Sequence, residues 1–110
     1  MKKTILLALL ALLLAAPVSA TQTESDAIDA VALEWYQTDD TDREIELELE
    51  LAALELEATS PECSLYAGWH LAAIAIYNQY VFTESPFLED AYMNMVQSTP
   101  QVQYACTIAL

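Results

Sequence analysis

The 110-residue sequence predicts an all-α fold: a small single-domain bundle of about five helices, stapled by one disulfide, after a cleaved signal peptide. Three observations support this prediction. Gly68 is the only glycine, and no Asn-Gly or Asp-Gly pair offers the tight turn typical of a β-hairpin. The longest charged stretch is built from the strong helix formers Glu, Leu and Ala. Ser or Thr followed by proline or an acidic residue recurs along the chain, as is typical of helix N-termini.

Residues 1–20 have the three parts of a bacterial signal peptide. Lys2 and Lys3 form a basic start, an apolar run covers residues 5–16, and Val18-Ser19-Ala20 supplies the small residues that signal peptidase needs. A retained membrane anchor is the alternative, but the apolar run is short for a membrane span. We therefore expect a periplasmic or secreted protein that begins at Thr21 and has no stable membrane insertion after cleavage.

The first helix is expected over residues 24–37. Thr23 and Asp26 have the spacing of a capping box at its start. Apolar residues then follow at helical intervals, including Ile28 and Trp35.

The second helix is expected over residues 42–58, where a strand is the alternative because glutamate alternates with aliphatic residues. Glutamate is depleted in strands, and Thr41 with Glu44 forms a second capping box, which favours the helix. Wound as a helix, the segment has two acidic and two aliphatic stripes. Its like-charged glutamates four residues apart predict a helix that is marginal at neutral pH and firmer in acid.

Three further helices are expected over residues 61–82, 86–97 and 100–110, each with a proline in or just before its first turn. The segment from Leu65 to Phe82 is apolar on nearly every side. A membrane span is one explanation of such a helix, and a central position in the core is the other. Polar residues interrupt the segment, which favours the core.

Charge is unevenly placed along the chain. All 17 acidic residues follow residue 20 and Arg43 is the only lysine or arginine there, so cleavage leaves a net charge of −16 with His70 neutral. We divide the one domain into an acidic half, residues 21–58, and an apolar half, residues 59–110. Nucleic-acid binding is excluded because it needs a basic patch, and anionic membranes are disfavoured. A basic partner protein would be attracted.

Cys63 and Cys106 are the only cysteines of a chain expected in an oxidising compartment. A disulfide between them is therefore the first expectation. A catalytic thiol is the alternative, but no lysine or arginine stands near either cysteine in sequence to lower its pKa.

Few residues suggest chemistry, and no catalytic residue, metal ligand or cofactor is predicted. His70 is the only histidine and has apolar neighbours, so a hydrogen-bonded core histidine is favoured over a catalytic one. One histidine and two bridged cysteines do not make a zinc site. Residues 40–51 resemble a calcium loop only at their start, because Ile45 stands at the sixth position and Leu51 at the twelfth. Chance carboxylate pairs are inevitable among so many acids.

Two short motifs around the cysteines resemble the small periplasmic acid-stress chaperones of the HdeA type. One is Cys63-Ser64-Leu65-Tyr66, and the other is Thr99-Pro100 followed after four residues by Ala105-Cys106-Thr107. The resemblance implies an exported helical protein with a single disulfide, and an activity that acid switches on.

The function expected first is non-enzymatic binding of a basic partner protein, as in an inhibitor or an immunity-type factor. The expected binding surface consists of seven acidic residues: Asp39, Asp40, Asp42, Glu44, Glu46, Glu48 and Glu50. The alternatives are an acid-activated periplasmic chaperone and, third, an enzyme. A purely solubilising acidic surface also accounts for the charge, and the oligomeric state is left open.

Overall fold

The computed structural model describes residues 22–109, which form four α-helices and contain no strand. These are α2 (Gln22–Gln37), α3 (Thr41–Glu57), α4 (Pro61–Thr83) and α5 (Pro86–Thr107). The all-α prediction is confirmed, whereas the two helices expected at the C-terminal end are a single one. The predicted signal peptide lies outside the described residues.

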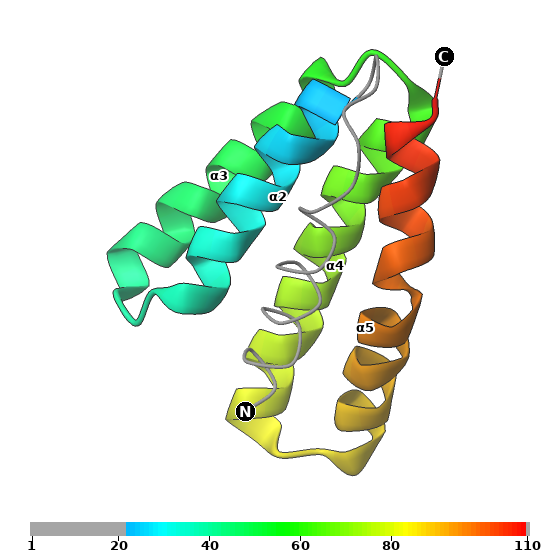
Figure 1. The fold of residues 1–110 in the computed structure, drawn as a ribbon. Helices are drawn as coiled ribbons and strands as arrows, with labels where there is room; N and C mark the ends of the chain where they lie inside the picture. The colour runs from blue at the N-terminus through cyan, green and yellow to red at the C-terminus, as the bar shows by residue number, and fades with distance from the viewer. Residues whose placement is uncertain (1–21, 110) are drawn as a thin grey trace.

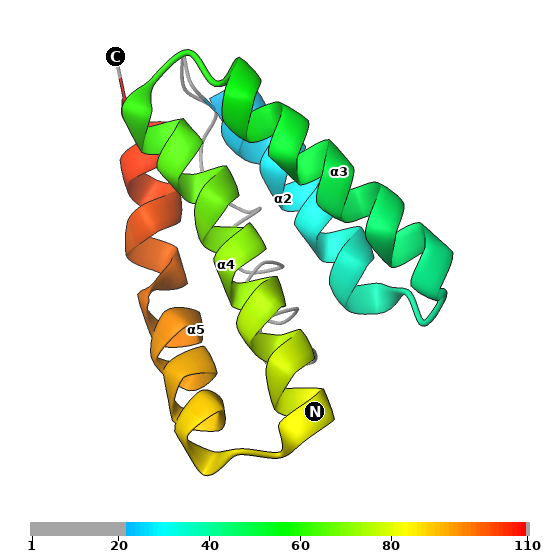
Figure 2. The ribbon, with the colours of Figure 1, turned by 180° about the vertical axis from the view of Figure 1, so that it is seen from behind.

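The helices form two antiparallel hairpins, α2–α3 and α4–α5, that lie side by side (Figure 1). The hairpins are close at the end where α2 begins and diverge toward the turn between α4 and α5, as Figure 2 also shows. α2 and α4 each pack against the three other helices, and α4 has the more extensive contacts with α3 and α5. The apolar segment of α4 contributes buried residues to the core, as predicted, but Leu65, Val81 and Phe82 of that segment are exposed. α3 packs against α2 and α4 and lies at the edge of the bundle.

The core fills the space between the two hairpins. Trp35 of α2 is fully buried, and its ring meets Tyr36 edge-on at 5.1 Å and Tyr77 of α4 at 5.9 Å. Aliphatic side chains from all four helices belong to the same core cluster. The large aliphatic side chains that are almost completely buried are Ile28, Leu47, Leu51, Ile74 and Val96. Within residues 22–109, no helix combines the length and the apolarity that a membrane crossing requires.

The predicted disulfide between Cys63 and Cys106 is present and buried. It joins the first turn of α4 to the last turn of α5, with the two Cα atoms 4.4 Å apart. Because the bridge closes a loop with a sequence separation of 43, it stabilises the fold by about 4 kcal/mol in the chain-entropy model. The bridge therefore fixes one end of the α4–α5 hairpin.

The helix break predicted at residues 98–100 is wrong, since α5 continues through Pro100. Proline removes one backbone donor and normally kinks or ends a helix. Here Val96 and Thr99 are buried on one side of Pro100 and Gln103 on the other, so packing against the rest of the bundle holds both halves in one helix. The Thr99 hydroxyl also donates to the Met95 carbonyl at 2.8 Å. The ribbon of α5 bends in its middle (Figure 1).

Besides the wrong start at Pro100, two of the predicted helix starts were right and two were assigned the wrong cap. Ser60 is the N-cap of α4 and accepts a hydrogen bond from the Cys63 N–H at 3.1 Å. Ser85 is the N-cap of α5, although its side chain makes no capping hydrogen bond. Thr23, expected as a cap, lies within α2. Thr41, the other expected cap, is the first residue of α3, and Asp40 is the cap instead.

Candidate partner-binding surface

The acidic residues predicted to bind a partner begin with Asp39 and Asp40 in the connection between α2 and α3. They continue with Asp42 in the first turn of α3, and all three are exposed. Asp40 caps α3: its Oδ1 accepts from the backbone N–H groups of Asp42 at 3.0 Å and Arg43 at 3.4 Å. A carboxylate at this position also interacts favourably with the positive end of the helix dipole. Asp40 therefore has a structural role as a helix cap. The sequence did not reveal this role, because Asp40 stands among other acidic residues.

Arg43 binds two of the predicted residues. Its guanidinium donates to Glu34 of α2 at 2.8 Å and to Glu46 at 3.0 Å, and lies 3.6 Å from Glu50. The hydrogen bonds from Arg43 hold the pKa of Glu34 below its ordinary value of 4.5. These pairs are on the surface, where ion pairs contribute little to stability. One guanidinium among three carboxylates leaves this cluster negative.

Glu48 faces a different way from Glu46 and Glu50. It is half-buried, and its Oε2 accepts a hydrogen bond of 3.2 Å from the indole N–H of Trp35. Glu48 thus satisfies the polar atom of a core tryptophan. The seven predicted residues therefore do not form one continuous patch.

The acids of α3 instead form two rows, which we call the glutamate rows. At 100° per residue, Glu46, Glu50 and Glu57 fall along one flank of the helix, and Glu44, Glu48 and Glu55 along the other. The prediction did not include Glu55 and Glu57. Their spacing of seven residues from Glu48 and Glu50 was the signal that could have added them.

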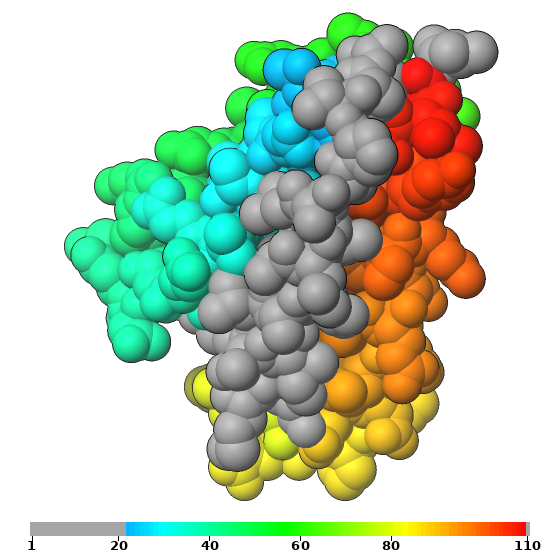
Figure 3. Space-filling model, viewed as in Figure 1, coloured from blue at the N-terminus to red at the C-terminus, as the bar shows by residue number. Residues whose placement is uncertain are grey.

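Between the rows, on the side away from the core, lies an apolar line that we call the outer stripe: Ile45, Leu49, Ala53 and Leu56. All four are exposed, whereas Leu47 and Leu51 on the opposite side are fully buried. The sequence predicted two aliphatic stripes, and the structure identifies which one faces the core. Figure 3 shows α3 along the outer edge of the molecule, on the side away from α5.

A second group of polar residues lies where α2 meets α4 and α5, and the sequence analysis predicted only its histidine, His70. We call it the polar seam, and it consists of Ser25, Asp29, Tyr36, Tyr66, His70 and Gln103, all buried. The Gln103 amide donates to the Ser25 hydroxyl at 3.2 Å, and the Tyr66 hydroxyl donates to Asp29 Oδ1. These residues stand at core positions, where a helical pattern predicts apolar side chains.

Asp29 is the carboxylate of the polar seam, and its Oδ2 has no hydrogen-bond partner among the described residues. Burial raises the pKa of Asp29 from 3.8 to about 6, and Asp26 adds to this effect. The hydrogen bond from Tyr66 and the nearby Gln103 amide lower the pKa of Asp29 but do not outweigh burial. Asp29 therefore titrates in the mildly acidic range.

His70 is a core histidine, as predicted, but only one of its ring nitrogens has a partner. Nδ1 lies 3.4 Å from the Tyr36 hydroxyl, while Nε2 has no hydrogen bond within residues 22–109. The Tyr66 ring meets the imidazole edge-on at 4.8 Å. Burial lowers the pKa of His70 from 6.5 to about 3, so the side chain is neutral in the folded protein at neutral pH.

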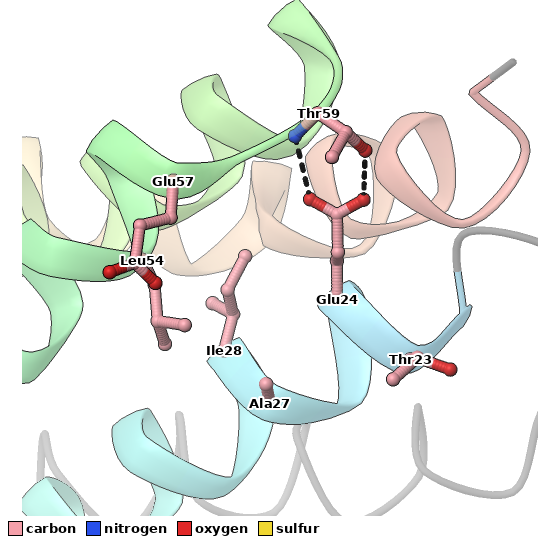
Figure 4. A pocket seen from close by; sticks show the side chains of 7 residues that line it. All are labelled: Thr23, Glu24, Ala27, Ile28, Leu54, Glu57 and Thr59. Carbon is pink, nitrogen blue, oxygen red and sulfur yellow. Dashed lines mark hydrogen bonds between the residues drawn. The ribbon is translucent and has the colours of Figure 1, made fainter.

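A pocket of about 240 Å³ lies between the start of α2 and the end of α3 (Figure 4). Ile28 and Leu54 are among its apolar lining, and Glu24 and Glu57 are its two acids. The Glu24 carboxylate accepts hydrogen bonds from the backbone N–H of Thr59, at 2.9 Å, and from the Thr59 hydroxyl. Glu24 is therefore used to fix the α3–α4 connection. The lining contains no histidine, cysteine or base that would suggest a reaction.

The described part of the chain contains no group of three or more His, Cys, Asp or Glu residues placed to hold a metal ion. Cys63 and Cys106 are joined to each other, so neither is a thiol in this structure.

No protein-family model, no curated protein sequence and no solved structure shows significant similarity to the chain. The resemblance to the HdeA type therefore rests on the two cysteine motifs alone.

Proposed function

We propose that this is an exported, periplasmic, non-enzymatic protein that binds a basic partner protein, as an inhibitor or immunity-type factor does. The observation that carries the proposal is the position of α3. It is an edge helix, and both glutamate rows border its open face. Arg43 is the only lysine or arginine of the described residues, and it pairs with Glu46 and Glu50 of one row.

The physical basis is long-range attraction followed by short-range pairing. A surface with one sign of charge steers an oppositely charged protein and raises its association rate at low ionic strength. Salt screens such attraction over about 10 Å at 0.1 M. Binding to α3 should therefore weaken steeply as salt is added.

The test is recovery of basic proteins from a cell-envelope extract at low salt, compared between two variants that each lose three negative charges. The first replaces three glutamates of one row with glutamine: Glu46, Glu50 and Glu57. The control replaces three acids near the α4–α5 turn with their amides: Glu84, Glu89 and Asp90. We expect the first variant alone to lose the partner. The proposal fails if the natural protein recovers no basic protein, or if both variants behave alike.

The second candidate function is an acid-activated chaperone, and His70 is the observation that favours it. A neutral histidine in the core, with an unpaired Nε2, opposes folding once acid protonates it in the unfolded chain. Protonation of His70 therefore favours opening of the polar seam, while protonation of Asp29 in the same seam opposes it. Opening would expose core side chains to unfolded clients.

The chaperone candidate is tested with an acid-denatured client protein at pH 2–3, by light scattering. The chaperone candidate is supported if aggregation of the client is suppressed. It also requires that the helix content of residues 42–58 and the binding of an apolar dye rise between pH 7 and pH 4. If the protein neither gains helix nor suppresses aggregation, this candidate is rejected. The binding of a basic partner predicts no protection of clients in acid.

A further inference from the structure

The outer stripe leaves aliphatic side chains in water on a helix whose other face is well anchored. Ile45, Leu49 and Leu56 are 53%, 67% and 86% exposed. The stripe residues follow one another at intervals of four, four and three, so they lie in one line along α3. At 1.5 Å per residue, the line from Ile45 to Leu56 is about 17 Å long, or about three turns. A narrow aliphatic line of this length matches the apolar face of a second helix.

The charge of the glutamate rows determines which kind of helix can pack on the outer stripe. They border the outer stripe on both sides, at the positions that select partners by charge when two helices pair. No lysine or arginine follows Arg43 in the sequence, so α4 and α5 supply no basic side chain to either row. The row of Glu46, Glu50 and Glu57 is exposed, whereas the row of Glu44, Glu48 and Glu55 is half-buried and its Glu48 also accepts from Trp35. Lysine or arginine on both flanks of an incoming helix would complement the exposed row fully and the half-buried row at its edge.

We propose that the outer stripe is the docking site for an amphipathic helix of the partner protein, apolar along one narrow face and basic on both flanks. The proposal rests on the proposed binding of a basic protein, and it narrows that function to one helix face. A second copy of α3 is disfavoured at neutral pH because its glutamate rows would meet those of the first. Anionic lipid is disfavoured for the same reason.

The test uses three synthetic peptides of 21 residues and measures their affinity by fluorescence anisotropy at neutral pH. The first forms a helix with leucine along one face and lysine on both flanks. The second has the same composition but a scrambled order without an apolar face, and the third has glutamate in place of lysine. We expect the first peptide to bind at least tenfold more tightly than the second, and the third not to bind.

Two double variants locate the binding site on the protein. Leu49→Gln with Leu56→Gln removes apolar area from the outer stripe, and should weaken binding of the first peptide at least tenfold. Val81→Gln with Phe82→Gln is the matched control, since these α4 residues are 57% and 91% exposed, and it should leave affinity unchanged. Circular dichroism confirms that both variants keep the helix content of the natural protein.

Several results would overturn the proposal. If the first and second peptides bind equally, and the outer-stripe variant keeps that affinity, the acidic surface binds cations without a helix-docking site. That result rejects the helix-docking site but is compatible with the proposed binding of a basic protein. If no basic protein is recovered from the envelope extract, the proposed function itself is rejected. Binding of the third peptide, or no binding of the first, also contradicts the proposal. The proposal is also contradicted if the natural protein forms a dimer at neutral pH, or binds phosphatidylcholine vesicles, and the outer-stripe variant does not.

Discussion

Replacing Asp29 with asparagine should change the pH dependence of stability by an amount that follows from its burial. The side chain is fully buried, and its pKa is raised from 3.8 to about 6. Each pH unit between these values is worth about 1.4 kcal/mol, so the ionised carboxylate costs the folded protein about 3 kcal/mol at neutral pH. Asparagine keeps an oxygen that can accept from Tyr66 and carries no charge.

The direction of the effect follows from where the proton is held. Between pH 3.8 and 6 the folded protein holds a proton on Asp29 that the unfolded chain has released. Stability therefore falls as the pH rises through this range, and the loss is complete above pH 6. We expect the free energy of unfolding of Asp29→Asn, relative to the natural protein, to rise by about 2 kcal/mol between pH 4 and pH 7, since part of the whole effect lies below pH 4.

Urea unfolding followed by circular dichroism at pH 4, 5, 6, 7 and 8 measures this difference. Any pH-independent cost of placing an amide beside Tyr66 cancels when the difference at pH 4 is subtracted. Asp39→Asn is the control, because its exposed side chain reports what the loss of one negative charge does to the whole protein. A difference between Asp29→Asn and the natural protein that changes by less than 1 kcal/mol from pH 4 to pH 7 would refute this account of the polar seam.

The other predictions concern single residues of the core and of α3. His70 has its pKa lowered from 6.5 to about 3, so the unfolded chain gains a proton first and stability falls as the pH drops through this range. His70→Phe should remove roughly 5 kcal/mol of that fall, and urea unfolding that loses stability equally in both proteins contradicts this. Asp40→Ala should destabilise the protein by about 1 kcal/mol through loss of the α3 cap, whereas Asp39→Ala should have little effect. Equal thermal midpoints for the two alanine variants would show that the cap is unimportant. Leu47→Ala should cost about 2–5 kcal/mol and Leu49→Ala less than about 0.5 kcal/mol, because only Leu47 is buried. A reversed order in denaturant unfolding would mean that the stripes of α3 are wrongly assigned.

The sequence was sufficient for the features that depend on local physics. The absence of hairpin turns and the wealth of helix formers predicted α2, α3 and α4 within a few residues at each end, and the start of α5. The pairing of Cys63 with Cys106 followed from cysteine number and compartment. For α3, periodicity revealed two aliphatic stripes but could not say which one is buried. That choice depends on how α2 and α4 pack against the helix, which is not a local property.

The errors have the same origin. Pro100 ends a helix by local rules, but the buried residues on either side of it hold α5 together. Thr41 and Asp40 are both residues that favour the N-cap position, and the helix start predicted from the sequence was one residue too late. The polar seam could not be predicted, because Asp29 and Tyr66 are far apart in sequence and meet only when α2 packs on α4.

The position of the Cys63–Cys106 bridge has a consequence for how the chain matures. Both cysteines belong to the α4–α5 hairpin, and two cysteines allow only one intramolecular pairing. Oxidation therefore needs only neighbouring helices to meet, and it is independent of the docking of α2 and α3. Contacts between helices adjacent in sequence form quickly during folding. A newly made chain in an oxidising environment can therefore complete its covalent structure before its acidic hairpin joins the bundle.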